Sequence, residues 1–149
     1  TGEQAKADKM AKDILPYMQQ YSSDNKKEKN VGQNEDHELA HAWMGVGNFD
    51  KALEFALAGY SRRPNNIEVN ETVAIVYYEK GDYTKALPFI ETALKTNCNN
   101  PQLLCHAGLI YAKNNQQDKA KKYLQQALVN NPSLPADLEK ACKVALLVL

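Results

Sequence analysis

The chain has 149 residues, 44% of them hydrophobic, and its 18 basic and 18 acidic side chains cancel. This length suits one domain with a packed core, and the neutral balance does not favour a polyanion or an anionic membrane surface as partner. No apolar run approaches the roughly 18 residues of a membrane-spanning helix. We therefore expect no nucleic-acid partner and no membrane span.

The first 32 residues divide into an apolar-striped part and a polar part. Apolar side chains at helical spacing predict an amphipathic helix over at least 3–15. The stripe consists of Ala7, Met10, Ala11, Ile14, Leu15 and Met18. Pro16 should kink or end this helix, because proline lacks a backbone N–H. Residues 22–33, SSDNKKEKNVGQ, are polar and without periodicity, which predicts a linker.

Residues 37–41, HELAH, fit the HExxH signature of zinc metalloproteases. Two histidines four residues apart share one helix face and can bind zinc, while the glutamate can act as general base. A resemblance to that family would make His37 and His41 zinc ligands and Glu38 the base. A zinc-dependent hydrolase is therefore one alternative function.

The rest of that signature is missing. Its longer form needs glycine and histidine at two positions where this chain has Met44 and Gly47. Catalytic zinc also needs a third protein ligand. No accompanying motif marks the glutamates that could supply one, Glu54, Glu68 and Glu71.

Three stretches spaced 34 residues apart carry nearly the same letters: GNFDKAL at 47–53, GDYTKAL at 81–87 and NQQDKAK at 115–121. A fixed period of this length indicates stacked copies of one structural unit. With residues 33, 67 and 101 each taken as position 1, positions 8, 20 and 27 hold only alanine or glycine. These nine residues are Ala40, Ala52, Gly59, Ala74, Ala86, Ala93, Gly108, Ala120 and Ala127. Position 11 is always a large aromatic residue: Trp43, Tyr77 or Tyr111.

This spacing resembles the tetratricopeptide repeat, a 34-residue helix–turn–helix unit. The resemblance implies an all-α fold, a right-handed superhelical solenoid of antiparallel helix pairs, with repeats at 33–66, 67–100 and 101–134. Two helices approach closely only where one offers a small residue, and extra methylenes at such a contact cost about 1–3 kcal/mol. The aromatic residue at position 11 fills the space that the small residues leave.

Position 15 lies between the two helices of each unit. It is Gly47, Gly81 or Asn115, residue types that tolerate a left-handed helix end. The residues that follow the two glycines, Asn48 and Asp82, are of types that cap helix N-termini strongly, so we expect both to cap the second helix of their unit.

The N-terminal segment fits the repeat frame in part, with Gly2 at position 15 and Ala7 at position 20. We therefore interpret residues 1–32 as the second helix of an upstream repeat followed by the linker. The chain would then be the C-terminal part of a longer protein.

Residues 135–149, PADLEKACKVALLVL, continue in the same frame, but position 11 is only Ala145. We predict a capping helix over 135–149 that covers the apolar edge of the last repeat. Its tail, VALLVL, either packs on that repeat or meets another partner or more chain. Self-association through this helix is a further alternative function.

The three cysteines are an odd number and include no CxxC pair. We therefore expect no disulfide framework and no zinc ribbon, but three small thiols, packed or exposed, at Cys98, Cys105 and Cys142.

The resemblance also implies a function. Tetratricopeptide repeat proteins bind an extended peptide or a partner helix along the concave face of their first helices. This implies a protein–protein interaction module that is not an enzyme and needs no cofactor or metal. The residues at the groove positions are Asn34, His37, His41, Met44, Glu68, Glu71, Ile75, Tyr78, Glu79, Gln102, Cys105, Leu109 and Lys113.

The side chains on that face limit the kinds of ligand that we expect to bind there. An acidic centre flanked by apolar residues suits a segment that carries Lys or Arg beside hydrophobic anchors. The family's two-carboxylate clamp for chaperone C-terminal tails uses Lys, Asn and Arg side chains. Its positions are occupied here by His37, His41, Thr72, Gln102 and His106, so we do not expect that ligand.

Overall fold

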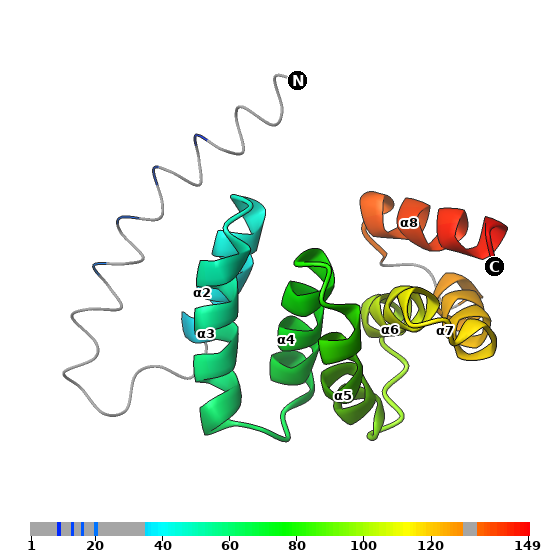
Figure 1. Cartoon of the computed structure of the whole chain (residues 1–149), viewed down its shortest axis with the longest axis horizontal. Helices are drawn as coiled ribbons and strands as arrows, with labels where there is room; N and C mark the ends of the chain where they lie inside the picture. The colour runs from blue at the N-terminus through cyan, green and yellow to red at the C-terminus, as the bar shows by residue number, and fades with distance from the viewer. Residues whose placement is uncertain (1–8, 10–12, 14–15, 17–19, 21–34, 130–133) are drawn as a thin grey trace. The chain divides into compact units, whose positions relative to one another are not determined.

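The computed structural model describes residues 9, 13, 16, 20, 35–129 and 134–149 (Figure 1). Helices α2 to α8 lie in these residues, and no strand does, so the prediction of an all-α fold is confirmed for this part of the chain. No helix within it has both the length and the apolar character needed to cross a membrane. The helices fall into two compact units, Thr1–Pro64 and Asn65–Leu149.

The predicted N-terminal helix and linker lie outside the described residues, with four exceptions. These are Lys9, Asp13, Pro16 and Gln20, which are helical and have exposed side chains.

The described part of the first unit is a pair of packed helices, α2 (Glu35–Gly45) and α3 (Phe49–Arg62). Arg62, at the end of α3, forms an ion pair with Asp36 at the start of α2, so the two helices run antiparallel. The turn between them passes through Gly47 at a φ of 74°. Asn48 then caps α3 as predicted, because its side chain accepts a hydrogen bond from the backbone N–H of Lys51 at 3.1 Å.

The second unit contains α4 (Ile67–Glu79), α5 (Tyr83–Leu94), α6 (Pro101–Lys113), α7 (Gln117–Val129) and α8 (Ala136–Leu147). Each of these helices packs on the next one in the chain (Figure 1). In addition, α4 contacts α6, and α6 contacts α8. The first helices of the two pairs, α4 and α6, therefore lie beside one another, and α8 lies beside α6, as expected when helix pairs stack.

The small residues of the repeat lie in the core. All nine are buried, and those at position 20, Ala52, Ala86 and Ala120, have no exposed surface. Their predicted burial is confirmed, while their place at the helix crossings stays a prediction.

The α4–α5 and α6–α7 pairs share one aromatic arrangement. The ring of Tyr77 stacks on that of Phe89 with centroids 5.7 Å apart, and Tyr111 stacks on Tyr123 at 5.5 Å. A lysine ammonium lies over the first ring of each stack, from Lys85 at 5.8 Å and from Lys119 at 4.9 Å. Corresponding residues stand 34 positions apart in the sequence, so equal spacing has produced equal contacts.

The turns inside these two pairs have the left-handed backbone that the sequence predicts, but one predicted helix cap does not form. Gly81 and Asn115 have φ values of 81° and 58°, in the left-handed region. Asp82 occupies the N-cap position of α5, yet its side chain makes no capping hydrogen bond. Its carboxylate lies 3.0 Å from Nζ of Lys85 instead.

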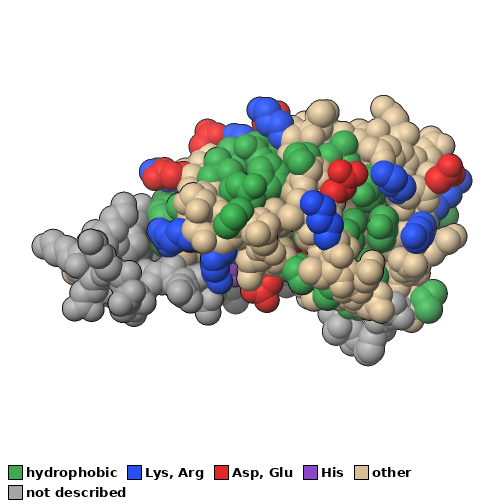
Figure 2. Space-filling view, turned by 90° about the horizontal axis from the view of Figure 1, so that it is seen from below, with side chains coloured by type: hydrophobic (Ala, Val, Ile, Leu, Met, Phe, Trp, Pro, Cys, Tyr) green, Lys and Arg blue, Asp and Glu red, His purple; other side chains and the backbone are tan. Residues whose placement is uncertain are grey.

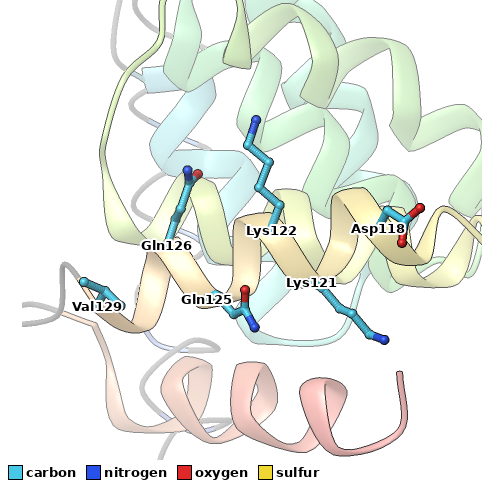
Figure 3. Close-up of a pocket in the computed structure, with 6 residues that line it drawn as sticks. All are labelled: Asp118, Lys121, Lys122, Gln125, Gln126 and Val129. Atoms are coloured by element: carbon cyan, nitrogen blue, oxygen red, sulfur yellow. The ribbon is translucent and has the colours of Figure 1, made fainter.

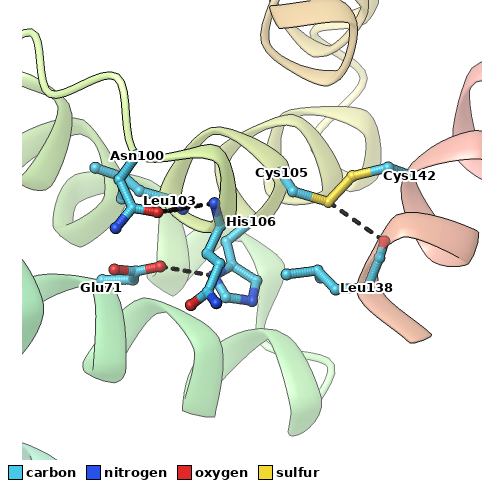
Figure 4. The surroundings of a disulfide bond; sticks show 8 residues. Glu71, Asn100, Leu103, Cys105, His106, Leu138 and Cys142 are labelled. Carbon is cyan, nitrogen blue, oxygen red and sulfur yellow. Dashed lines mark hydrogen bonds and ion pairs between the residues drawn. A yellow bond between two sulfur atoms is a disulfide. The ribbon is translucent and has the colours of Figure 1, made fainter. Parts of the chain in front are cut away.

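The expectation of three free thiols is wrong for two of the cysteines. Cys105 on α6 and Cys142 on α8 form a disulfide, with Cα atoms 6.1 Å apart (Figure 4). Only Cys98 is free. The physical reason is tertiary: α8 packs on α6 and brings together two side chains that are separated by 37 positions in the sequence.

The C-terminal helix packs on the last helix pair with one of its faces. Leu138, Ala145 and Leu146 contact the buried cluster that includes Leu104 and Leu124. The opposite face is exposed, with exposed fractions of 53% to 85% at Val144, Val148 and Leu147. Some side chains of the apolar tail therefore pack on the core, and the others are exposed at the surface.

Candidate functional site

A cleft of about 330 Å³ lies among α4, α6 and α8 in the second unit. Its lining consists of Ile75, Tyr78 and Glu79 from α4, His106, Leu109 and Ile110 from α6, and Asp137, Leu138 and Ala141 from α8. The α4 and α6 sides come from the first helices of two successive pairs, where the family resemblance places the ligand groove. The α8 side was not among the predicted groove residues.

Four of the predicted groove residues line this cleft: Ile75, Tyr78, Glu79 and Leu109. Three others from the same helices, Glu68, Gln102 and Lys113, are exposed but do not line it.

The imidazole of His106 is held at the edge of the cleft by a carboxylate from the neighbouring helix. Its Nδ1 lies 2.7 Å from Oε1 of Glu71, and the two side chains are only 21% and 16% exposed. Figure 4 shows the imidazole between Glu71 on α4 and Leu138 on α8. Glu71, predicted as a groove residue, therefore orients another side chain of the site.

Tyr78 brings a neutral phenol to the cleft. Burial raises its pKa above the ordinary value, and the nearby Tyr83 and Glu79 raise it further. The rings of Tyr78 and Tyr83 lie 5.4 Å apart, centroid to centroid. A hydroxyl that keeps its proton can both donate and accept a hydrogen bond with a bound chain.

The charge of the cleft is acidic. Glu79 and Asp137 contribute carboxylates from α4 and α8, and none of the described residues that line the cleft is Lys or Arg. Figure 2 shows one face of the molecule, on which basic and acidic side chains are intermixed around patches of hydrophobic side chains. The cleft therefore combines an acidic rim with the apolar side chains of Ile75, Leu109 and Leu138.

Cys105 was predicted to face a ligand, and this prediction is wrong. Its side chain has no exposed surface and is bonded to Cys142. The corresponding position on α4 is Glu71, which is partly exposed. Position 5 is buried on α6 because α8 packs over it.

The predicted site residues of the first repeat belong to the other unit. On α2, the rings of His37 and His41 lie 4.5 Å apart at their centroids. His41 is exposed, Met44 is partly exposed, and Asn34 lies outside the described residues. Within the described part of the chain, no three His, Cys, Asp or Glu side chains are grouped to hold a metal ion, so no third zinc ligand joins the two histidines there.

A second hollow of about 550 Å³ runs along α7 (Figure 3). Its lining is Asp118, Lys121, Lys122, Gln125, Gln126 and Val129, all from one helix and all exposed. In Figure 3, Lys121 and Gln125 leave the helix on the side opposite to Lys122 and Gln126. These side chains do not converge on one point, so the cleft among α4, α6 and α8 is the stronger candidate site.

In a comparison with known proteins, one segment of the chain matches a family model. Residues 101–133, which include α6 and α7, match the family model of the tetratricopeptide repeat. No curated protein matches the chain.

Proposed function

Because residues 101–133 form a tetratricopeptide repeat, we propose that the chain is a protein–protein interaction module without catalytic activity. Repeats of this family stack to present a surface to a partner, and the equivalent aromatic contacts of the α4–α5 and α6–α7 pairs support a shared architecture. We assign two further repeats, at 33–66 and 67–100, from their sequence spacing.

The ligand we propose is a short extended segment that carries Lys or Arg next to an apolar side chain. The observation that carries this assignment is the composition of the cleft, in which apolar side chains lie beside carboxylates on opposing helices. The apolar residue of the ligand would contact Leu109 and Leu138, and its cation would lie near Glu79 and Asp137. Complementary charge favours such a partner and disfavours an acidic one.

Direct binding tests this proposal. The probes are two pools of fluorescein-labelled peptides, one with Lys or Arg beside Leu or Phe, and a matched pool with Glu in place of the basic residue. Fluorescence anisotropy should show tighter binding of the basic pool. Added salt should weaken that binding, because exposed charges are screened. Equal binding of the two pools would contradict the charge assignment.

Variants locate the site. Glu79→Gln and Asp137→Asn should each weaken binding of the basic pool by about two- to fivefold, as expected for one exposed charge pair. The matched control is Asp118→Asn, which removes an exposed carboxylate from α7, outside the cleft. An equal loss in that control would mean that net charge, and not the cleft, determines binding.

The exposed face of α8 supports a second candidate function, which is self-association. Val144, Leu147 and Val148 form an apolar surface that a second copy of the chain could cover. Light scattering on the intact chain should then give a dimer, and Leu147→Asp should give a monomer. A monomer for the intact chain over the full concentration range would remove this candidate.

A further inference from the structure

Helix α8 is a wall of the cleft, yet it has few buried side chains. It contributes Asp137, Leu138 and Ala141 to the lining. Within α8 only Cys142 is fully buried, while Leu138, Ala145 and Leu146 are only partly buried. Beside the partly buried contacts of Leu138, Ala145 and Leu146, the most deeply buried attachment of α8 is therefore Cys142.

That residue is bonded to the opposite wall. Cys142 and its disulfide partner Cys105 on α6 both have no exposed surface. Sγ of Cys105 also lies 3.6 Å from the carbonyl oxygen of Leu138, which lines the cleft (Figure 4). The disulfide thus joins the two helices directly behind the cleft.

We propose that this disulfide is a redox-dependent lock that holds α8 in place as a wall of the cleft. This inference rests on the proposed function, because it concerns control of the same binding site. In the oxidised chain, the S–S bond keeps α8 against α6. In the reduced chain, α8 separates and the cleft loses three of its lining residues.

The chemistry needs a dithiol as reductant. One of its thiolates attacks a sulfur of the disulfide, and the other cysteine leaves as a thiolate and takes up a proton. The second thiol of the reductant then displaces the first cysteine, and the reductant ends as a disulfide. Two S–H groups replace the S–S bond of the protein, and the two electrons come from the dithiol.

We expect reduction to release α8 because its remaining contacts with the buried cluster come from side chains that are only partly buried, Leu138, Ala145 and Leu146. An isolated helix of 12 residues is marginal in water, so α8 depends on its packing to stay helical. Its exposed apolar face adds nothing to that packing. Both sulfurs are buried, so the reductant reaches them only when α8 opens, and the rate of reduction should level off at high dithiol concentration.

Hydrogen exchange measured by mass spectrometry tests the lock on the full chain, with Cys98→Ser introduced to remove the free thiol. After reduction with dithiothreitol, the amides of α8 should exchange about tenfold faster or more, while those of α4 and α5 keep their rates. Unchanged exchange in α8 would overturn the proposal. A general rise in every helix would also overturn it, because reduction would then loosen the whole unit.

A matched variant separates loss of the bond from loss of packing. Cys142 occupies repeat position 8, where two earlier repeats have alanine, so Cys142→Ala keeps a residue that suits the site. Without reductant, this variant should show the fast α8 exchange of the reduced chain. Slow exchange in the variant would mean that packing alone holds α8, which contradicts the lock.

Binding of the basic peptide pool tests whether the lock controls the cleft. The oxidised chain should bind it at least about fivefold more tightly than the reduced chain. If α8 is released but neither form binds peptide, the lock is supported and the proposed ligand is wrong. If both forms bind equally while α8 is released in one, the lock does not control the cleft.

Discussion

Gly108 on α6 lies directly against Leu124 on α7. A Cβ atom added at Gly108 would stand 2.5 Å from Cγ of Leu124 and 3.1 Å from its backbone nitrogen. Leu124 has no exposed surface, and its backbone nitrogen could not move aside as a flexible side-chain end can. The small-residue rule of the repeat therefore has a direct steric cause at this position.

The substitution Gly108→Ala should lower the free energy of unfolding by about 1–3 kcal/mol, because the overpacking exceeds the gain in helix propensity. The control is Gly45→Ala at the end of α2, where an added Cβ has no neighbour within 4 Å. That change should be neutral or stabilising by up to about 1 kcal/mol. Urea denaturation of both variants measures the difference, and a neutral Gly108→Ala would show that α6 and α7 are less closely packed than described.

Asn115 carries a left-handed backbone conformation without being glycine, at a φ of 58°. Asn115→Ala should destabilise the chain by about 1 kcal/mol, because a Cβ without a polar side chain is disfavoured there. Asn115→Gly should be neutral or slightly stabilising, since Gly47 and Gly81 occupy the same repeat position. Thermal unfolding of the two variants checks that the glycine variant is more stable than the alanine variant. If alanine and glycine behave alike, the turn does not hold this conformation in solution.

Asn114 ties the end of α6 to the start of α5. Its Nδ2 donates to the carbonyl oxygen of Tyr83 at 2.9 Å and to that of Ile110 at 2.8 Å. Asn114→Ala should cost about 1–3 kcal/mol, because it removes two hydrogen bonds that contribute about 0.5–1.5 kcal/mol each. Gln125→Ala, on the exposed face of α7, is the control and should stay within about 0.5 kcal/mol. Equal urea midpoints for the two variants would show that these hydrogen bonds contribute nothing.

Tyr111 should make the fold sensitive to alkaline pH. Burial raises its pKa well above the ordinary value, and Glu91, which accepts from its hydroxyl at 3.4 Å, raises it further. The folded chain keeps this proton, whereas the unfolded chain loses it near pH 10. The contribution of Tyr111 to stability is therefore full below about pH 10 and is lost as the pH rises toward the folded-state pKa.

Urea denaturation between about pH 8 and about pH 11 measures this effect. Tyr111→Phe has no phenol at this position, so its stability should fall less steeply over that range. All other side chains are the same in the two proteins, so their effects cancel in the comparison. Parallel pH profiles for the two proteins would exclude Tyr111 as the cause.

The repeat pattern predicted the helix pairs because it depends on contacts between residues near each other in the chain. Alanine and glycine at fixed positions predicted which side chains are buried, and glycine or asparagine predicted the left-handed turns. The family resemblance implied Ile75, Tyr78, Glu79 and Leu109 as groove residues, and these four line the cleft, while their role in binding stays a prediction. The handedness of the solenoid and the limits of the first two repeats stay predictions.

Contacts between helices that are far apart in the sequence could not be predicted from the repeat pattern. An odd number of cysteines contains no information on which two will meet, and the pairing of Cys105 with Cys142 became visible only when α8 was seen beside α6. The same packing buried one predicted groove residue and added α8 as a wall of the cleft. His106 was missed for a similar reason, because its partner Glu71 belongs to another helix.

For this chain, the order of residues determined the helices, their turns and their buried faces, since each depends on backbone geometry and a short period. The tertiary structure alone decided the disulfide, the imidazole–carboxylate pair and the shape of the cleft. These depend on how closely whole helices approach, and that distance is set by many side chains acting together.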